Sequence, residues 1–372
     1  MDSEYLHVMT WNIGFSSRKV SFIKDDSKRA EELIKFIHDI QKEGNIIINA
    51  IAFQEIANRV YIGLNSFYLS TYLNSVGINT KFVPALSLGE NHSYPYGKIK
   101  QLNEKFDISF QEQGIGLGIP DASEKWNNSW KLQNLYSDDH FYLSKVEISK
   151  PLPYPLYMGN KPHSSAGRDE EDRPVLWSRI NKIDQALISP KVYFCSIHLP
   201  TLKNEEKNVT ELNETQKNIA ENILNIEVSK DNTIIDPQSN GTWTIDNLGT
   251  KLRLYMLRQI VFQTNYIEKY WNHGDNSINC VFILAGDFNF YHNQSSDENE
   301  FLSNNGFKCC KTTGISRPTK IGKQPRLIDN IWVKGANISE YTLNGNQIEQ
   351  TQYLNKLDII SDHYPVIGKI TL

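Results

Sequence analysis

Several features that would place a protein in a special class are missing or scarce in this chain of 372 residues. No apolar run approaches the ~18 residues that a membrane-spanning helix needs. The opening stretch MDSEYLHVMTWNIGF has no basic segment followed by an apolar one, so we expect no secretory signal. Four cysteines are too few for a disulfide framework. Together these absences favour a reducing, cytoplasmic location.

The positions of the cysteines support the same expectation. Cys195 and Cys280 lie inside apolar runs and are expected to pack as small core residues. Cys309 and Cys310 are adjacent, which leaves two alternatives, a redox pair or an ordinary edge position, and the second is favoured.

A strong excess of either charge is also missing. The net charge is −4 and the pI is near 6.2, with 39% hydrophobic and 22% charged residues. This balance does not support a general nucleic-acid coat, although a local basic groove stays open.

Apolar runs that predict strands recur along the chain, and only two helices are clear. The first helix is predicted over 28–44 and the second over 252–271, from apolar residues at helical spacing. Many strands with few helices suggest a layered α/β sandwich. The predicted strands are 5–13, 48–56, 175–180, 191–199, 280–288, 327–333 and 364–372.

Two irregular segments interrupt this pattern. Residues 203–250 are polar and rich in asparagine, and we expect partial helix around 215–226. Residues 121–172 are also irregular, and their aromatic part over 121–157, with Trp126 and Trp130, would stack unpaired bases, grip a lipid or form a packed cap. No linker divides the chain, so residues 1–372 are interpreted as a single domain with two insertions.

Polar residues that can bind a hard metal or move a proton follow these apolar runs. Each alone has an ordinary explanation as a turn former, a solvated edge or a structural histidine. Together they offer oxygen and imidazole groups and no cysteine, which suits Mg²⁺, Mn²⁺ or Ca²⁺ better than zinc. The residues are Asn12, Glu55, His198, Asp287, Asn289, Asp329, Asp362 and His363.

The order and wording of these motifs resemble the endonuclease/exonuclease/phosphatase superfamily. The matching stretches are TWNIG, FQEI, SIHLPT, LAGDFN, LIDNIWV and SDHYPV, from Asn12 to Val366. The resemblance implies a four-layer αββα sandwich with two central, mainly antiparallel or mixed sheets. It also implies Mg²⁺-dependent hydrolysis of phosphate esters, with Mn²⁺ as a substitute and Ca²⁺ less favoured.

The resemblance also implies a role for each polar residue. Asn12, Glu55 and Asp362 would surround the cation, with Glu55 as the strongest ligand. His363 would act as a base that is oriented by Asp329.

The remaining roles concern water and phosphate. Asp287 and Asn289 would orient the attacking water and contact the scissile phosphate, on one face only if the strand continues through Phe288. His198 would donate to the phosphoryl oxygen or the leaving group.

Two further residues have weaker support. Glu112 is a possible partner of His198. Arg173 is a possible phosphate contact, for which a surface salt bridge is nearly as good an explanation.

The substrate is less well defined than the reaction. GDFNFY and PRLIDNIW depart from inositol polyphosphate 5-phosphatases, and Gly14 and Ala57 stand where deoxyribonucleases place arginines for the minor groove. Bacterial sphingomyelinases share the histidine of SIHL but are secreted. A nuclease or phosphodiesterase acting on nucleic acid or nucleotides is favoured.

Two other functions are weighed against this one. The alternative is a phosphodiesterase or phosphatase of lipid head groups or small phosphorylated molecules, and a non-enzymatic binding module is disfavoured. Tyr291 and His292 have no assigned role and lie where substrate choice would be made.

Overall fold

Two six-stranded sheets form the centre of the protein in the computed structural model. Its description covers residues 5–14, 26–57, 59–62, 65–84, 113–133, 175–183, 190–199, 227–228, 234–235, 242–243, 245–268, 279–292, 295–310, 327–341, 360–361 and 363–372. The first sheet contains, in spatial order, β16 (Asn337–Glu340), β17 (Val366–Thr371), β1 (Tyr5–Asn12), β2 (Ala50–Ala57), β6 (Gln113–Pro120) and β5 (Ile78–Pro84). The second contains β14 (Lys308–Cys309), β15 (Asp329–Lys334), β13 (Cys280–Asp287), β9 (Lys191–His198), β8 (Val175–Lys182) and β7 (Trp130–Gln133).

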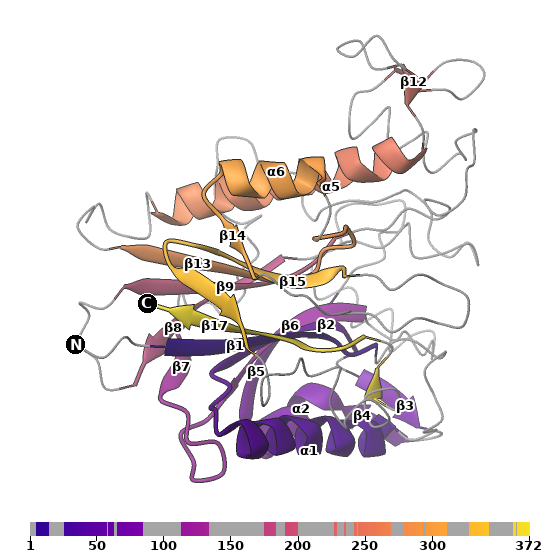
Figure 1. The fold of residues 1–372 in the computed structure, drawn as a ribbon. Coiled ribbons are helices and arrows are strands. Elements are labelled where there is room, and N and C mark those ends of the chain that lie inside the picture. The colour runs from indigo at the N-terminus through magenta and orange to yellow at the C-terminus, as the bar shows by residue number, and fades with distance from the viewer. Residues whose placement is uncertain are drawn as a thin grey trace.

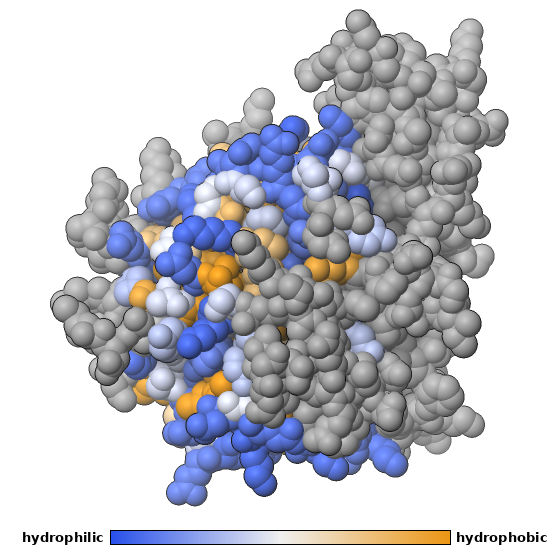
Figure 2. All heavy atoms as spheres, in the orientation of Figure 1, coloured by the Kyte–Doolittle hydropathy of each residue, from blue (hydrophilic) through white to orange (hydrophobic). Residues whose placement is uncertain are grey.

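Helices cover the outer face of each sheet, which completes the expected αββα order (Figure 1). The first sheet packs on α1 (Asp26–Gly44) and α2 (Leu69–Ser75), and the second on α5 (Ile245–Tyr266) and α6 (Asp297–Asn304). In Figure 2 hydrophilic residues cover the described surface over the helices, and hydrophobic residues lie between them at the level of the sheets. The four-layer sandwich is therefore confirmed.

Alternation along the central strands explains why they are buried on both faces. On β1, Leu6 and Val8 enter the core between the sheets, while Met9 and Trp11 enter the core under α1. Strands β9 and β13 are buried along their whole length, as continuous apolar runs predict. The same alternation decides which polar residue at a strand end faces the opposite sheet.

Within each sheet, the strands that carry the site lie side by side. Strands β1 and β2 are parallel, as are β9 and β13, and the other described pairs of these two sheets are antiparallel. Parallel neighbours end at the same edge of a sheet. The ends of β1 and β2 face the ends of β9 and β13, because β1 packs against β13 and β2 against β9, and Asn12 is bonded to Asp287.

All seven predicted strands and both helices are present. The second helix begins at Ile245, earlier than predicted. The sequence pattern missed β5 and β6, because β6 (QGIGLGIP) is rich in glycine. A side chain at Gly118 would press on Ile78 and Phe53, so glycine allows the close packing that its low strand propensity hides.

Smaller elements lie outside the two large sheets. Strands β3 (Arg59–Ile62) and β4 (Asn65–Tyr68) pair in antiparallel fashion. A short sheet inside the 203–250 segment contains β10 (Glu227–Val228), β11 (Ile234–Ile235) and β12 (Thr242–Trp243). The helix expected at 215–226 falls outside the described residues. Among the helices that are described, none is long and apolar enough to cross a membrane.

The cysteines behave as core and edge residues. Cys195 and Cys280 are buried, as expected, and Cys309 lies in the edge strand β14. Burial raises the pKa of Cys309 to about 12, which disfavours the reactive thiolate. Cys310 is buried between the sheets. This environment agrees with the favoured edge position for Cys309, places Cys310 in the core instead, and does not agree with a redox pair.

Gly286 allows the close approach of β13 to β9, and its replacement tests this packing. A methyl group at this position would overlap the carbonyl oxygen of Ile197. We predict that Gly286→Ala lowers the free energy of unfolding by about 3 kcal/mol, as overpacked cores do, measured by urea denaturation. Gly306→Ala is the control, because its φ of +82° adds strain but a methyl group there would meet only Lys334, at ordinary contact distance, so its loss should be about 1 kcal/mol. Equal losses in the two variants would contradict this account.

Candidate active site

Six polar side chains converge where the ends of three neighbouring strands of one sheet face three of the other. Strand β1 packs against β13, β2 against β9, and β17 against β15. Asn12 and Asp287 continue the faces of β1 and β13 that line the space between the sheets. The six residues are His363, Asn12 and Glu55 from the first sheet and Asp329, Asp287 and His198 from the second.

Asp287 lies at the centre of this group. Its Oδ2 accepts a hydrogen bond from Asn12 Nδ2 at 3.1 Å and lies 3.5 Å from His198 Nε2. Its Oδ1 accepts from the backbone N–H of Asn289 at 3.0 Å. Donors on both oxygens stabilise the ionised carboxylate, although the side chain is only 2% exposed.

A β-bulge aims Glu55 at the same place. The register between β2 and β6 shifts at Gln54 and Ile56, and Glu55 is the extra residue, with φ +50°. Its Oε1 accepts from Asn12 Nδ2 at 3.4 Å. A bulge that redirects one side chain, at a strained φ, is typical of functional sites.

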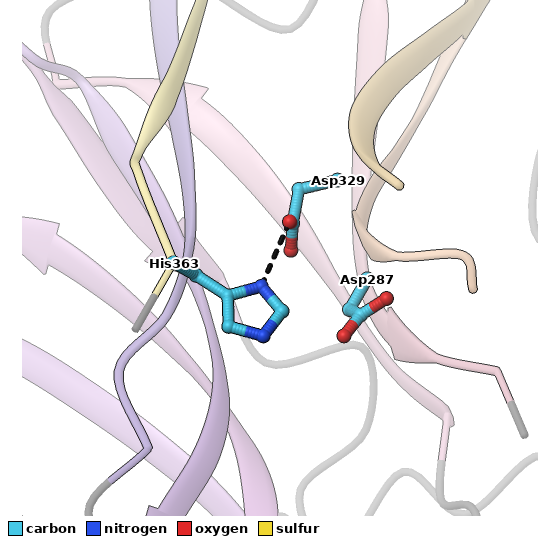
Figure 3. Close-up of side chains that lie close together, drawn as sticks. All are labelled: Asp287, Asp329 and His363. Atoms are coloured by element: carbon cyan, nitrogen blue, oxygen red, sulfur yellow. Dashed lines mark hydrogen bonds and ion pairs between the residues drawn. The ribbon is translucent and has the colours of Figure 1, made fainter. Parts of the chain in front are cut away.

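His363 and Asp329 form the buried pair that the motifs predicted. Nδ1 of His363 lies 2.9 Å from Oδ2 of Asp329, and both side chains are buried (Figure 3). Because an ionised carboxylate can only accept, Nδ1 donates its proton and Nε2 is the nitrogen that can take up another. The ligating atoms of Asp287, Asp329 and His363 all lie within 4.8 Å of one another.

Three residues that the sequence reasoning missed hold the segment before β17 against the end of β1. Ser361 donates its hydroxyl to the Asn12 carbonyl and accepts from His363 N–H, and Trp11 Nε1 donates to the His363 carbonyl at 2.9 Å. The buried guanidinium of Arg29 donates to the carbonyls of Ile13 and Ile360. In the sequence of α1, Arg29 comes directly before Ala30, the first residue of the apolar face. A charged residue next to that face was a signal in the sequence that Arg29 could be buried.

Asn289 is placed differently from its expected position. Strand β13 ends at Asp287 instead of continuing, and Asn289 has φ +55°. Its Nδ2 donates to the Leu199 carbonyl at 2.6 Å, which ties the turn to β9. Phe288 is fully buried behind the turn, as predicted. An amide nitrogen carries two hydrogens, so Asn289 can keep this bond and still donate to a phosphate.

Some predicted residues do not reach the site or lie beyond the described part of the chain. Asp362, Arg173 and Glu112 fall outside the described residues. Trp126 and Trp130 were candidates for base stacking, but both are buried in the cores, at 1% and 5% exposure. Trp126 stacks on His38, with ring centroids 4.0 Å apart. The stacking role is therefore wrong for these two tryptophans.

His292 also proves to be a structural residue. Its Nδ1 accepts from Trp332 Nε1 at 3.3 Å, and its Nε2 lies 3.3 Å from the Ile328 carbonyl. The ring packs beside Phe288 and Phe290. Burial lowers the pKa of His292 to about 3. A role in substrate choice does not fit a ring whose two nitrogens are used inside the protein.

Three buried carboxylates with two histidines make a donor set that fits a hard cation. Glu55, Asp287 and Asp329 are 6%, 2% and 0% exposed, and buried anions need compensating charge or hydrogen bonds. Glu55 and Asp287 share one amide donor, Asn12, so their oxygens lie around a common point. Carboxylate and amide oxygens suit Mg²⁺ or Mn²⁺.

Comparison with known proteins adds a general likeness of fold. No protein-family model and no curated protein matches this chain. TDP2 of D. rerio, complexed with a single-strand DNA product, is 11% identical over 99% of this chain and 100% of that one, with a TM-score of 0.47. The human Nocturnin catalytic domain with bound sulfate is 11% identical over 99% and 97%, with a TM-score of 0.47.

A third solved structure is similar to the same degree. An endonuclease/exonuclease/phosphatase from Beutenbergia cavernae is 13% identical over 99% of this chain and 72% of that chain, with a TM-score of 0.46. At such low identity these likenesses say nothing about the chemistry of this chain.

The pKa of His292 generates a testable pH dependence. An unfolded histidine titrates near 6.5, so as the pH falls below 6.5 the unfolded chain binds a proton that the folded chain excludes. The free energy of unfolding therefore decreases from pH 6.5 toward pH 3. Between pH 7 and pH 5 the wild type should lose about 2 kcal/mol more than His292→Phe, measured by urea denaturation at each pH. Parallel pH curves for the two proteins would contradict a half-buried His292 that stays neutral in the folded protein.

Proposed function

We propose that this chain is a metal-dependent phosphoesterase of the endonuclease/exonuclease/phosphatase superfamily, with residues 1–372 as a single domain that carries two insertions. One observation supports the proposal most strongly. The strand-end residues of six separate motifs meet in one buried group between two sheets. A set of unrelated turn formers would have no reason to converge.

Glu55, with Asn12 and Asp362, would hold the cation, and the nearby carboxylate of Asp287 fits the same role. A bound Mg²⁺ supplies positive charge that stabilises the phosphate as negative charge develops on it. The protein's part is to present these oxygen donors in a fixed arrangement. The bulge at Glu55 and the shared donor Asn12 support that arrangement.

His363 would accept a proton from the attacking water at Nε2. Asp329 holds the imidazole through Nδ1 and stabilises its positive charge after proton transfer. Because Asp329 is fully buried and its Oδ2 faces Nδ1, the ring keeps one orientation. This pair is the orienting acid and the base that water activation requires.

Asp287 and Asn289 would orient water and phosphate, and His198 would donate to a phosphoryl or leaving-group oxygen. His198 Nε2 lies 3.5 Å from Asp287 Oδ2, on the strand next to β13. The three residues are linked, because Asn289 contacts both Asp287 and the carbonyl of Leu199, which follows His198. A change in one of them is expected to disturb the others.

The substrate that we propose is a nucleic acid or a nucleotide, as the motif wording favours. A lipid head group or another small phosphorylated molecule is the alternative. A hydrolysis panel separates them: single- and double-stranded DNA, RNA, a dinucleotide, sphingomyelin and inositol phosphates, each with Mg²⁺ and Mn²⁺. Cleavage of a long nucleic acid should weaken by orders of magnitude between about 50 and 200 mM salt, whereas a small substrate responds little.

Removal of the central carboxylate or the base tests the assignment. We predict that Asp287→Ala and His363→Ala each lower kcat by about 10³-fold or more, while circular dichroism shows a folded protein. His7→Ala is the matched histidine control, because His7 lies toward the other end of β1 and should leave kcat unchanged. Turnover at the wild-type rate in either site variant, or no metal-dependent hydrolysis of any ester by the wild type, would refute the proposal.

A further inference from the structure

Directly beneath the site, three polar side chains are fully buried in the aliphatic core between the sheets. Thr10 on β1, Gln54 on β2 and Ser196 on β9 are each 0% exposed. Val8 and Phe194 are their apolar neighbours on the same faces. Apolar side chains of similar volume would fill this space at no lower stability, because burial of polar groups has to be offset by hydrogen bonds. Packing alone therefore does not explain these three residues.

The three side chains form one directed chain of hydrogen bonds. Thr10 Oγ1 donates to Gln54 Oε1 at 3.2 Å, and Gln54 Nε2 donates to Ser196 Oγ at 3.2 Å. The Ser196 hydroxyl then donates to the Phe53 carbonyl at 3.2 Å. This series of hydrogen bonds crosses from the first sheet to the second and returns to the first. Because Gln54 is bonded at both ends of its amide, its orientation is fixed.

Each member of this polar chain lies next to a site residue along its strand. Thr10 is two residues before Asn12, and Ser196 is two residues before His198, so each pair shares a strand face. Gln54 immediately precedes Glu55, where the bulge interrupts the pairing of β2 with β6. The polar chain therefore joins β2 to β9 at the point where Glu55 leaves the regular ladder.

We infer that Thr10, Gln54 and Ser196 are positioning residues that fix the spacing and register of β2 and β9, and so hold Glu55 and His198 in place around Asp287. The inference rests on the proposed function and deepens it. Hydrogen bonds have a fixed direction and length, which non-directional apolar contacts lack. Residues that support metal ligands and catalytic groups in this way influence metal affinity and rate without touching the substrate.

The test replaces the whole polar chain with apolar groups of similar size, in the variant Thr10→Val/Gln54→Met/Ser196→Ala. We expect its urea midpoint to equal or exceed that of the wild type, since the three polar side chains are removed together and only the Phe53 carbonyl loses a donor. We expect kcat to fall by about 10- to 100-fold, with KM little changed, and Mn²⁺ affinity, measured by calorimetry, to weaken by a similar factor. A purely structural role would lower the midpoint and leave kcat and Mn²⁺ affinity unchanged.

Two single variants sharpen the comparison. Gln54→Met alone leaves the buried Thr10 hydroxyl without its acceptor, so it should lose as much kcat as the triple variant and have a lower urea midpoint. Val192→Ala removes volume from the same core on β9, farther from His198. It should lower the midpoint and leave kcat and Mn²⁺ affinity unchanged.

A triple variant with wild-type kcat and wild-type Mn²⁺ affinity would overturn the inference. Failure of the proposed function is a separate outcome: the wild type would then hydrolyse no phosphate ester. In that case the Mn²⁺ affinities of the triple variant and the wild type still test whether the polar chain is a positioning element. Weaker binding in the triple variant supports its positioning role, and equal binding, or no binding by the wild type, refutes it.

Discussion

The rest of the site depends on one interaction, the hydrogen bond that the carboxylate of Asp287 accepts from Asn12. Asp287 ends a fully buried strand of the second sheet and accepts this hydrogen bond from Asn12 of the first. A shift of one sheet against the other breaks this bond and separates Asn12 and Glu55 of the first sheet from Asp287 and His198 of the second. Because Glu55 and Asp329 add two more buried carboxylates, the region holds an excess of negative charge that a divalent cation would offset. The fold and the proposed chemistry therefore both require that the two sheets stay aligned at Asp287.

The sequence predicted the parts of this arrangement that depend on regular patterns. Apolar runs located β9 and β13, which are buried along their whole length. The resemblance of the motifs to a known superfamily implied the pairing of His363 with Asp329, although Asp329 begins β15 and His363 precedes β17. The strands are predictable because their period and length are set by backbone geometry, whereas the pairing rests on the resemblance alone.

The parts that could not be predicted depend on irregular backbone and on contacts between distant segments. No glycine or proline marks the bulge at Glu55, and Asn289 has a positive φ where a continuing strand was considered. The orientation of the His292 ring is set by Trp332 and Ile328, which lie far along the chain. Its position just after the GDFN motif therefore did not indicate a role in substrate choice. Strained backbone of this kind costs free energy and is retained at functional sites.

The most direct measurement is anomalous diffraction from crystals of the wild-type protein and of Glu55→Gln grown with Mn²⁺. The account predicts a Mn²⁺ peak beside the carboxylates of Glu55 and Asp287 in the wild type, and its loss or strong reduction in the variant. Peaks only at surface carboxylates, or a site between the sheets that is equally occupied in both proteins, would contradict the central claim that these buried strand ends form a metal site.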